Sequence, residues 1–522
     1  MRKYDLTDLG FHYKGAATAK FTNFMLGPWK VIEVPFDVDV EVAKEEISRF
    51  LNKICALEIP TSLRCNLRCS YCYIEDPRMK NKDVSKNSVN DILKRASTIF
   101  PKLMKENVTE KEKVHVSPWG AEPFMNIDTL ETVYEFCHNT YGKGKYMVGT
   151  STNGTIWSDR ISNFFTNLIK DDAIEQLQIS LDGPPEVHDR YRRYANGNPS
   201  FKDIEKFTFK FRSLMASLGV NKKIDHFCST IHLTDKFFPE IWRDTADFFS
   251  TPDKWWSTFP FLPMRMSGEN MDNNLEIERF IKAQFLTAKL SKSKQEKGIK
   301  VVDFYTARLF GEISCKSKNA FPYCSAMNTQ IGVDIDGSMY PCHGAITTPT
   351  YKPFLWFGNI FDGVLSYQKI IRNIHYQFGS ILTRAKCSSC PVYNFSSGNI
   401  CWSCAAHNLA MSGNPLIDNI NKCIAYSESF KYWVQIAKMN INNPILDEIP
   451  IDVWFGNGMD SINPSDNLIE SRRENMHYDR NYDGFIMKAI DKFTGILPND
   501  NIQYVDEWWK MDNYLENVKK GS

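Results

Sequence analysis

Hydrophobic positions in residues 54–300 follow two periods that alternate along the chain. Short apolar runs typical of buried strands occur six times, at 55–60, 114–117, 147–152, 177–181, 227–233 and 258–262. Between or after these runs, apolar residues recur every three or four positions, which predicts helices over 88–100, 127–141, 158–170, 201–218, 235–249 and 275–295. Strands that alternate with helices predict an α/β fold with a parallel sheet and right-handed crossovers. In such folds the chemistry gathers at the C-terminal ends of the strands.

Three further segments surround this α/β unit. Residues 1–53 show a strand pattern at 31–35 and a helical pattern at 42–53, and they either cap the unit or contribute to substrate binding. Residues 301–430 carry eight cysteines. Residues 431–522 are aromatic and rich in turns, with helical patterns at 484–494 and 505–519, and we expect them to pack on the α/β unit. We therefore divide the chain at 1–53, 54–300, 301–430 and 431–522.

Composition excludes several classes of protein. The chain has 522 residues, of which 43% are hydrophobic, so it is a folded protein with more than one domain. Its 63 Lys and Arg residues nearly balance its 62 Asp and Glu residues, which gives no electrostatic case for nucleic acid or a membrane surface. We find neither a signal peptide nor 18 uninterrupted apolar residues, so we expect a cytoplasmic protein. In that compartment, 14 cysteines favour metal over disulfides.

A cluster of three cysteines follows the first predicted strand, in the sequence Cys65-Asn-Leu-Arg-Cys69-Ser-Tyr-Cys72. A closed zinc site or a fully ligated iron–sulfur cluster needs four protein ligands. Three thiolates on one loop can instead hold three irons of a four-iron cluster and leave the fourth iron open to a small molecule. Tyr71 would shield such a cluster from water. Half of a zinc ribbon is the alternative, but no second Cys-x-x-Cys follows at ribbon spacing.

Polar motifs follow the second, third and fourth predicted strands. They are Trp119-Gly-Ala-Glu-Pro123, Ser151-Thr-Asn-Gly-Thr155 and Ser180-Leu-Asp-Gly-Pro184, the last followed by His188-Asp-x-x-Arg192. Each motif alone is ordinary turn chemistry at a strand end, and the arginines alone are typical of a solvated helix surface. Because parallel strands end at one edge of a sheet, we expect these motifs to lie beside the cysteine loop.

The cysteine loop and these motifs together resemble the radical S-adenosylmethionine (SAM) enzymes. The resemblance implies a partial (β/α)6 TIM-type barrel with a [4Fe-4S] cluster on Cys65, Cys69 and Cys72. It also implies that the Gly-Gly-Glu-Pro-like motif binds the SAM amino group through its backbone, although Ala121 replaces the second glycine. Ser180 and Arg192 (or Arg193) would hold the SAM carboxylate. The full set of implied SAM-binding residues is Tyr71, Gly120, Ala121, Glu122, Ser151, Asn153, Ser180, Asp182 and Arg192.

Eight cysteines lie in residues 301–430, the number that two fully ligated four-iron clusters require. A predicted hairpin with an Asp336-Gly337 turn delivers Cys342. The order of the cysteines resembles the SPASM domain with two auxiliary clusters, which implies the sets Cys315, Cys324, Cys342, Cys404 and Cys387, Cys390, Cys401, Cys423. The ten residues between Cys390 and Cys401 and the two between Cys401 and Cys404 depart from the family pattern, so this partition is less secure than the total. Two zinc sites remain the alternative, because spacing does not separate zinc from iron–sulfur.

The resemblance implies a reaction and its partners. SAM cleavage would give a 5′-deoxyadenosyl radical that abstracts a hydrogen atom from a peptide or protein side chain, in the maturation of a ribosomally synthesised peptide. Three [4Fe-4S] clusters, SAM and an electron donor such as flavodoxin or ferredoxin would be needed. A serine/cysteine oxidase of the sulfatase-maturating type is the first rival. It carries an aspartate base where His343 follows Cys342 here, so His343 is either a catalytic base or a neighbour of the cluster.

A multi-cluster electron carrier without catalysis is the second rival, and the SAM motifs argue against it. The three remaining cysteines are interpreted as structural thiols, with Cys55 and Cys228 at the end of the barrel away from the cluster and Cys137 in a helix.

Overall fold

The computed structural model describes residues 21–35, 39–72, 74, 83–220, 224–257, 264–267, 274–303, 305–306, 325–347, 355–367, 369–370, 373 and 420–440. Several predictions lie outside these residues, namely the strand at 258–262, the helices at 484–494 and 505–519, and the ligands Cys315, Cys324, Cys387, Cys390, Cys401 and Cys404. Cys423 lies in helix α15 (Ile420–Asn440), whose side chains are described from Ile424 onward.

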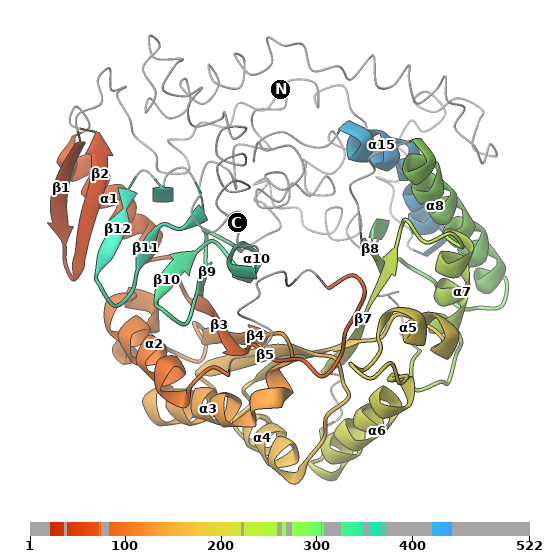
Figure 1. Ribbon diagram of the computed structural model, residues 1–522, viewed down its shortest axis with the longest axis horizontal. Coiled ribbons are helices and arrows are strands. Elements are labelled where there is room, and N and C mark those ends of the chain that lie inside the picture. Colours follow the sequence, from red (N-terminus) through yellow and green to blue (C-terminus); the bar gives the residue numbers. More distant parts are fainter. Residues whose placement is uncertain are drawn as a thin grey trace, which may run out of the picture.

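The centre of the molecule is an α/β unit in which six parallel strands alternate with helices, so the predicted fold class is confirmed (Figure 1). The strands are β3 (Ala56–Ser62), β4 (Val114–Gly120), β5 (Tyr146–Thr152), β6 (Ile174–Ser180), β7 (Asp225–His232) and β8 (Met264–Ser267). The helices are α2 (Lys86–Ile99), α3 (Ile127–Tyr141), α4 (Asp159–Lys170), α5 (Pro185–Tyr191), α6 (Phe201–Ser217), α7 (Glu240–Phe249) and α8 (Asn274–Gln295).

The sheet of this unit continues beyond β3 into a twelve-stranded sheet. Strand β9 (Gln330–Val333) pairs in parallel with β3, and β10 (Ser338–Tyr340) forms the predicted hairpin with β9, with Gly337 at φ 83° in the turn. Next in order come β11 (Gly358–Asn359), β12 (Val364–Ser366), β2 (Trp29–Pro35) and β1 (Phe21–Leu26). Two segments far apart in the sequence therefore extend one edge of the barrel sheet.

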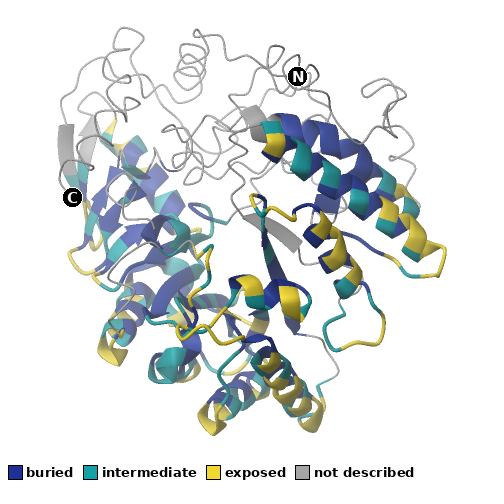
Figure 2. Ribbon diagram, turned by 45° about the vertical axis from the view of Figure 1, so that its right-hand side comes forward, coloured by how far each residue is buried: buried dark blue, intermediate teal, exposed yellow. Residues whose placement is uncertain are grey.

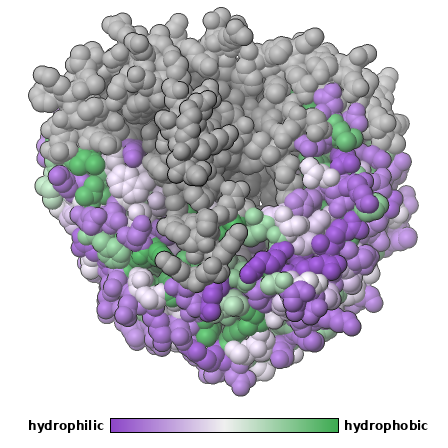
Figure 3. Space-filling model, viewed as in Figure 1, coloured by the Kyte–Doolittle hydropathy of each residue, from purple (hydrophilic) through white to green (hydrophobic). Residues whose placement is uncertain are grey.

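Helices α2 to α7 cover the outer side of the curved sheet (Figure 1). Helix α2 buries Val89, Ile92 and Ala96 and is capped by Ser85, whose hydroxyl accepts a hydrogen bond from the amide of Ser88 at 3.0 Å. The same pattern of a buried stripe and an exposed opposite side runs along the other outer helices (Figure 2). Their solvent surface is mainly hydrophilic (Figure 3).

The two faces of the barrel sheet differ in polarity because side chains alternate along each strand. The outer face, under the helices, carries buried apolar residues: Leu57, Ile59, Val114, Val116, Val148, Leu177, Ile179, Phe227 and Ile231. The register places polar residues on the inner face: Glu58, Ser117, Ser151, Gln176, Gln178, Ser180, Thr230 and His232. Ser151 and Gln176 are exposed there. Parallel sheets are commonly apolar on both faces, so this inner face is adapted to contact water or a polar ligand.

The remaining described elements lie around the barrel. Helix α1 (Val40–Leu51) precedes β3, the short helix α10 (His343–Thr347) follows the β9–β10 hairpin, and single 3-10 turns occupy Pro101–Leu103, Lys105–Asn107 and Pro123–Asn126. Helix α15 packs along α8, where the indole of Trp433 donates to Gln284 Oε1 at 2.9 Å. Within the part of the chain that the structure describes, no helix has the length and apolar character needed to span a membrane.

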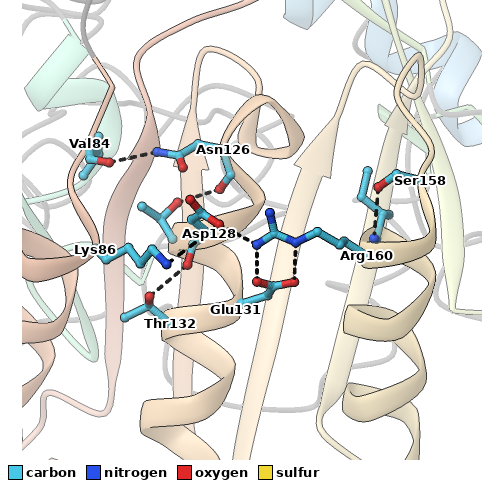
Figure 4. Close-up of polar contacts among 10 residues, drawn as sticks. Val84, Lys86, Asn126, Asp128, Glu131, Thr132, Ser158 and Arg160 are labelled. Atoms are coloured by element: carbon cyan, nitrogen blue, oxygen red, sulfur yellow. Dashed lines mark hydrogen bonds and ion pairs between the residues drawn. The ribbon is translucent and has the colours of Figure 1, made fainter.

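Polar contacts tie the starts of neighbouring helices together beside the ends of the barrel strands (Figure 4). Asn126 donates to the carbonyls of Thr61 (3.0 Å) and Val84 (2.9 Å), which links the end of β3 to the approaches of α2 and α3. Arg160, in the first turn of α4, bonds to Asp128 and Glu131 of α3. These contacts fix the spacing of the loops that carry the predicted motifs.

Candidate active site

The cysteine loop leaves the C-terminal end of β3 and is held by the segment that follows α5. The amide of Arg68 donates to the carbonyl of Arg193 at 2.7 Å, and that of Ser70 donates to the carbonyl of Tyr191 at 3.1 Å. Leu67 is 2% exposed and anchors the middle of the loop in the protein. The loop therefore has a fixed path over the ends of the strands, as the position of the motif after the first strand predicted.

The three cysteines of the loop are free thiols in different surroundings. Cys65 and Cys69 are partly buried and Cys72 is exposed. Burial, with a smaller contribution from Glu122, raises the pKa of Cys65 to about 12, and burial also raises the pKa of Cys69. A thiolate at these positions therefore needs a nearby cation, and iron coordination would supply one. Among the described residues, no three His, Cys, Asp or Glu side chains converge as a metal site, and this includes the three thiols.

The Gly120-Ala121-Glu122 motif packs directly against the start of the cysteine loop. Gly120 has φ +153°, and a Cβ atom there would lie 1.9 Å from the carbonyl oxygen of Ser62. The amides of Ala121 and Glu122 donate to the carbonyls of Ser62 and Arg64, both at 2.9 Å. The motif is therefore bound to the loop through its amides, and the glycine at its first position is required by the close approach of the two backbones.

The Glu122 side chain joins the ends of β4 and β5 rather than facing solvent. Its carboxylate accepts hydrogen bonds from the Thr152 hydroxyl (2.8 Å) and from the amides of Phe124 (3.1 Å) and Asn153 (2.7 Å). It is 1% exposed, and burial raises its pKa to about 7. Asn153 in turn donates from Nδ2 to Asn66 at 2.8 Å and lies 3.7 Å from Cys65 Sγ. Glu122 thus positions Asn153 against the cysteine loop.

A buried carboxylate, Asp182, occupies the centre of the site after β6. It is 0% exposed, and its Oδ2 atom accepts from Arg192 Nε at 3.0 Å and from the Tyr71 hydroxyl. Its Oδ1 atom accepts from the amide of Thr230 on β7 at 3.0 Å. Arg192 Nη1 lies 3.8 Å from Cys69 Sγ. The structure thus brings four predicted residues together: Tyr71, Cys69, Asp182 and Arg192.

The orientations of the two arginines distinguish their roles. Burial would lower the pKa of Arg192, but the adjacent Asp182 carboxylate raises it well above its usual value, so Arg192 is a permanent cation beside Cys69. Arg193 instead bonds to the carbonyls of Asp189 (2.6 Å) and Gly197 (3.2 Å) and is exposed. Of the two candidates that the sequence left open, Arg192 is the one at the site.

A fourth cysteine, Cys342, reaches the inner face of the sheet from the β9–β10 hairpin. Cys342 lies over Gly332, where a Cβ atom would come within 2.8 Å of the Cys342 carbonyl carbon. The next residue, His343, is held by Glu58 of β3, with Nδ1 2.7 Å from Oε1. The His343 ring lies 5.7 Å from the ring of Trp119, the residue before Gly120. Trp119, just before the Gly120 motif, and His343, which stands where the sulfatase-type enzymes carry an aspartate, are far apart in the sequence but meet in space.

Some residues of the site were not apparent from the sequence. Glu58 lies inside the first strand, and its inward orientation follows only from the register with β4 and β9. Thr230 contributes a backbone amide, which leaves no sequence signal. Cys228 was predicted at the far end of its strand, but it pairs with Ser180, the last residue of β6, because β7 begins earlier than predicted.

Comparison with known proteins identifies one domain of the chain. The profile of the Radical SAM superfamily matches residues 59–221, the segment from β3 to α6 that holds the cysteine loop and all three strand-end motifs. This segment is a Radical SAM domain. The family implies SAM and a [4Fe-4S] cluster as cofactors.

Three relatives extend this comparison. A protein of Methanocaldococcus jannaschii with no assigned activity is 28% identical over 159 residues, which is 30% of this chain and about half (48%) of that protein. The radical SAM cyclopropyl synthase TigE of Paramaledivibacter caminithermalis is 23% identical over 69% of this chain and 72% of its own length. A cysteine-type anaerobic sulfatase-maturating enzyme of Clostridium novyi is 26% identical over 54% of this chain and 71% of its own length.

Solved structures agree on the fold. The chain superimposes on anSMEcpe with bound AdoMet at a TM-score of 0.55 and 18% identity, and the match covers 76% of this chain and 99% of that one. At this identity the likeness supports the α/β barrel and its parallel sheet.

Proposed function

We propose that the enzyme uses a SAM-derived radical to modify a peptide or protein side chain, in the maturation of a ribosomally synthesised peptide. The observation that carries the proposal is the convergence of the cysteine loop, Gly120, Asn153 and Arg192 at one end of the barrel, above a polar inner face. The exposed Ser151 and Gln176 on that face suit the amides of a peptide better than an apolar substrate. The relatives named for modifying proteins, such as the sulfatase-maturating enzyme, support the same class of substrate.

Each motif has a role in this proposal. Cys65, Cys69 and Cys72 hold three irons of the cluster. The carbonyls of the Gly120–Glu122 segment, whose amides are already bonded to the loop, accept from the SAM amino group. Arg192 and Ser180 bind the SAM carboxylate, Ser151 and Asn153 line the remainder of the SAM site, and Tyr71 and Asp182 lie beside Arg192. Bound SAM and cluster together supply the 5′-deoxyadenosyl radical that removes a hydrogen atom from the substrate.

We propose further that residues 301–430 form a SPASM-like domain with two auxiliary [4Fe-4S] clusters, between a barrel at 54–300 and a C-terminal extension at 431–522. Cys342 supports this assignment, because Gly332 and the Glu58–His343 contact fix it against the barrel sheet. The other seven ligands are Cys315, Cys324, Cys387, Cys390, Cys401, Cys404 and Cys423. An auxiliary cluster at Cys342 would accept the electron left after oxidation of the substrate or would bind the substrate.

His343 is the residue that separates the proposal from its rival. In sulfatase-type serine/cysteine oxidation the base is an aspartate at this position, whereas here an imidazole is held by Glu58 and packs near Trp119. A ring fixed in this way suits a hydrogen-bonding role beside Cys342 and the substrate. The match to a cysteine-type sulfatase-maturating enzyme keeps the oxidase as the second candidate.

The proposal is tested by anaerobic assays on reconstituted enzyme. Reconstituted enzyme with SAM and dithionite should release 5′-deoxyadenosine, and flavodoxin or ferredoxin should replace dithionite. An iron count of about twelve per chain supports three clusters, and about four iron with zinc removes the auxiliary clusters. Conversion of a cysteine- or serine-containing sulfatase peptide to formylglycine would favour the oxidase, and absence of any 5′-deoxyadenosine would overturn the proposed reaction.

A further inference from the structure

We propose that Asp182 is a positioning residue that sets the orientation of Arg192 and couples it to the cysteine loop, so that SAM affinity depends on a carboxylate that does not itself contact SAM. The inference rests on the proposed role of Arg192 in binding the SAM carboxylate. It revises the role that the family resemblance implies for Asp182 and Tyr71, from SAM contacts to a hydrogen-bonded support.

Both carboxylate oxygens of Asp182 accept hydrogen bonds, and the donors come from three other segments. Tyr71 comes from the cysteine loop, Arg192 from the segment after α5 and the amide of Thr230 from β7. Its own carbonyl accepts from the Ser229 hydroxyl at 3.1 Å. A carboxylate with three donors already in place has little capacity left for a ligand. Its position is instead suited to holding the guanidinium of Arg192 next to Cys69.

A second chain of hydrogen bonds, made by neutral groups, connects Asp182 to Arg192. The amide of Asp182 donates to His188 Nδ1 at 3.2 Å, and His188 Nε2 lies 3.0 Å from the Ser200 hydroxyl. That hydroxyl donates to the carbonyl of Arg192 at 2.6 Å. Burial, with a smaller effect of Arg192, lowers the pKa of His188 well below its usual value, which is consistent with a neutral ring that accepts at Nδ1 and donates at Nε2. The backbone of Arg192 is therefore fixed as well as its side chain.

Tyr71, Asp182 and Arg192 form what we call the inner unit. An outer unit of the same composition, Tyr191, Asp235 and Arg190, lies next to it. The carboxylate of Asp235 accepts from the Tyr191 hydroxyl and from Arg190 Nη1 at 3.3 Å. The two tyrosine rings are 6.1 Å apart, so the units are neighbours. Their burial differs: the Arg192 side chain is 11% exposed and the Arg190 side chain 39%. Among the described residues, Arg190 bonds to no cysteine sulfur, and it instead lies 4.9 Å from the ring of the exposed Phe237. This outer unit is a matched control for the inner one.

The inner and outer units can be compared by conservative substitutions. Asp182→Asn and Tyr71→Phe remove one charge and one hydroxyl from the inner unit, and Asp235→Asn and Tyr191→Phe do the same to the outer one. SAM affinity is measured on anaerobically reconstituted, reduced protein from the change that SAM causes in the EPR spectrum of the cluster. Thermal unfolding of each variant reports structural damage separately.

We expect Asp182→Asn to weaken SAM binding about tenfold or more and Tyr71→Phe about threefold, the range for loss of charge-assisted and neutral hydrogen bonds. Asp235→Asn and Tyr191→Phe should change SAM affinity less than about twofold even where they lower the unfolding temperature. If Asp182 acted only through its charge, its removal would leave a more positive site and tighten binding of the SAM carboxylate.

Equal or tighter SAM binding by Asp182→Asn therefore overturns the inference, as does an equal loss in the outer unit. Should Asp182→Asn fail to fold, Tyr71→Phe decides, because it removes only one hydroxyl and an unchanged affinity contradicts the support role. If the wild-type spectrum does not respond to SAM at all, the proposed function fails, whatever the variants show.

Discussion

The two ends of the barrel contain the same pair of side chains in different surroundings. At the C-terminal ends of the strands, Tyr71 donates to Asp182; at the N-terminal ends, Tyr146 donates to Asp171 at 2.6 Å. The imidazole of His138 completes the second group, with Nδ1 2.6 Å from the same oxygen of Asp171. A buried tyrosine–carboxylate contact therefore carries no functional information by itself.

The Tyr71–Asp182 and Tyr146–Asp171 pairs differ in the residues around them. Asp182 joins three segments that converge on the cysteine loop, and one of its partners lies beside a cysteine sulfur. Asp171 caps the C-terminal end of α4 and joins it to the end of α3 and the start of β5, all of which are parts of the scaffold. We infer that substitutions at the first end act on SAM chemistry, and that those at the second end act on stability. The following experiments test this contrast, from the largest expected effect to the smallest.

The largest contrast is between the two cysteines that flank β3. Cys65→Ala removes a proposed cluster ligand and should lower 5′-deoxyadenosine release by about three orders of magnitude or more, as expected when the catalytic group is lost. Cys55→Ala, at the opposite end of the same strand, should leave release per folded protein within about twofold. Iron content and product are measured together on both variants. Comparable losses at the two positions would show that strand integrity, rather than ligation, controls activity.

Most elements of the barrel could be predicted from the sequence. Alternating periods located α3 at its observed bounds and β4 to β7 to within three residues at either end, because these elements are amphipathic or apolar and bounded by turns. The motifs at the strand ends were confirmed as neighbours of the cysteine loop by the hydrogen bonds of Asn153 and Arg192. Their assignment as SAM ligands stays a prediction.

The remaining features depend on long-range pairing, which has no local signal. The pairing of β12 with β2 joins residues more than 300 positions apart, and the contact of Glu58 with His343 depends on β9 taking its place beside β3. The choice between Arg192 and Arg193 was open for a similar reason. Both side chains are arginines, and only the path of the chain after α5 decides which one turns toward Cys69.

Glycines at the two ends of the barrel provide the second contrast. Gly120→Ala would place a Cβ atom 1.9 Å from the Ser62 carbonyl oxygen, so the cysteine loop must shift and stability should fall by about 3 kcal/mol or more. Gly142, at the C-terminal end of α3, has φ +83° and open space around the added atom, so Gly142→Ala should cost only about 1–2 kcal/mol of backbone strain. Denaturant unfolding and SAM binding separate the two, since only Gly120→Ala should impair SAM binding in the folded fraction.

The unfolding free energy should depend on pH because the Glu122 carboxyl near the cysteine loop is buried. Glu122 accepts hydrogen bonds from neutral donors, and its pKa is raised from 4.5 to about 7. Below about pH 4.5 it is protonated in both folded and unfolded chains; as the pH rises toward 7 only the unfolded chain ionises. The unfolding free energy should therefore fall by up to about 3 kcal/mol across this window and change little above it.

The measurement is denaturant unfolding of anaerobically loaded protein between about pH 5 and pH 8. Glu122→Gln removes the titrating group and should flatten the profile, although it loses at least one hydrogen bond and lowers stability at every pH. A profile in which the wild type is most stable near neutral pH and the variant behaves identically would assign the titration to other groups.

The smallest expected effect is at the N-terminal end of the barrel, and it tests whether that end is only structural. Tyr146→Phe removes the hydroxyl that donates to Asp171, leaving an oxygen that still accepts from His138, so the loss of stability should be about 1–2 kcal/mol. The SAM dissociation constant and the release of 5′-deoxyadenosine per folded chain should stay within about twofold of wild type. A tenfold change in either would mean that α3, β5 and α4 transmit strain along the barrel to the cysteine loop, and the separation of the two ends would then be wrong.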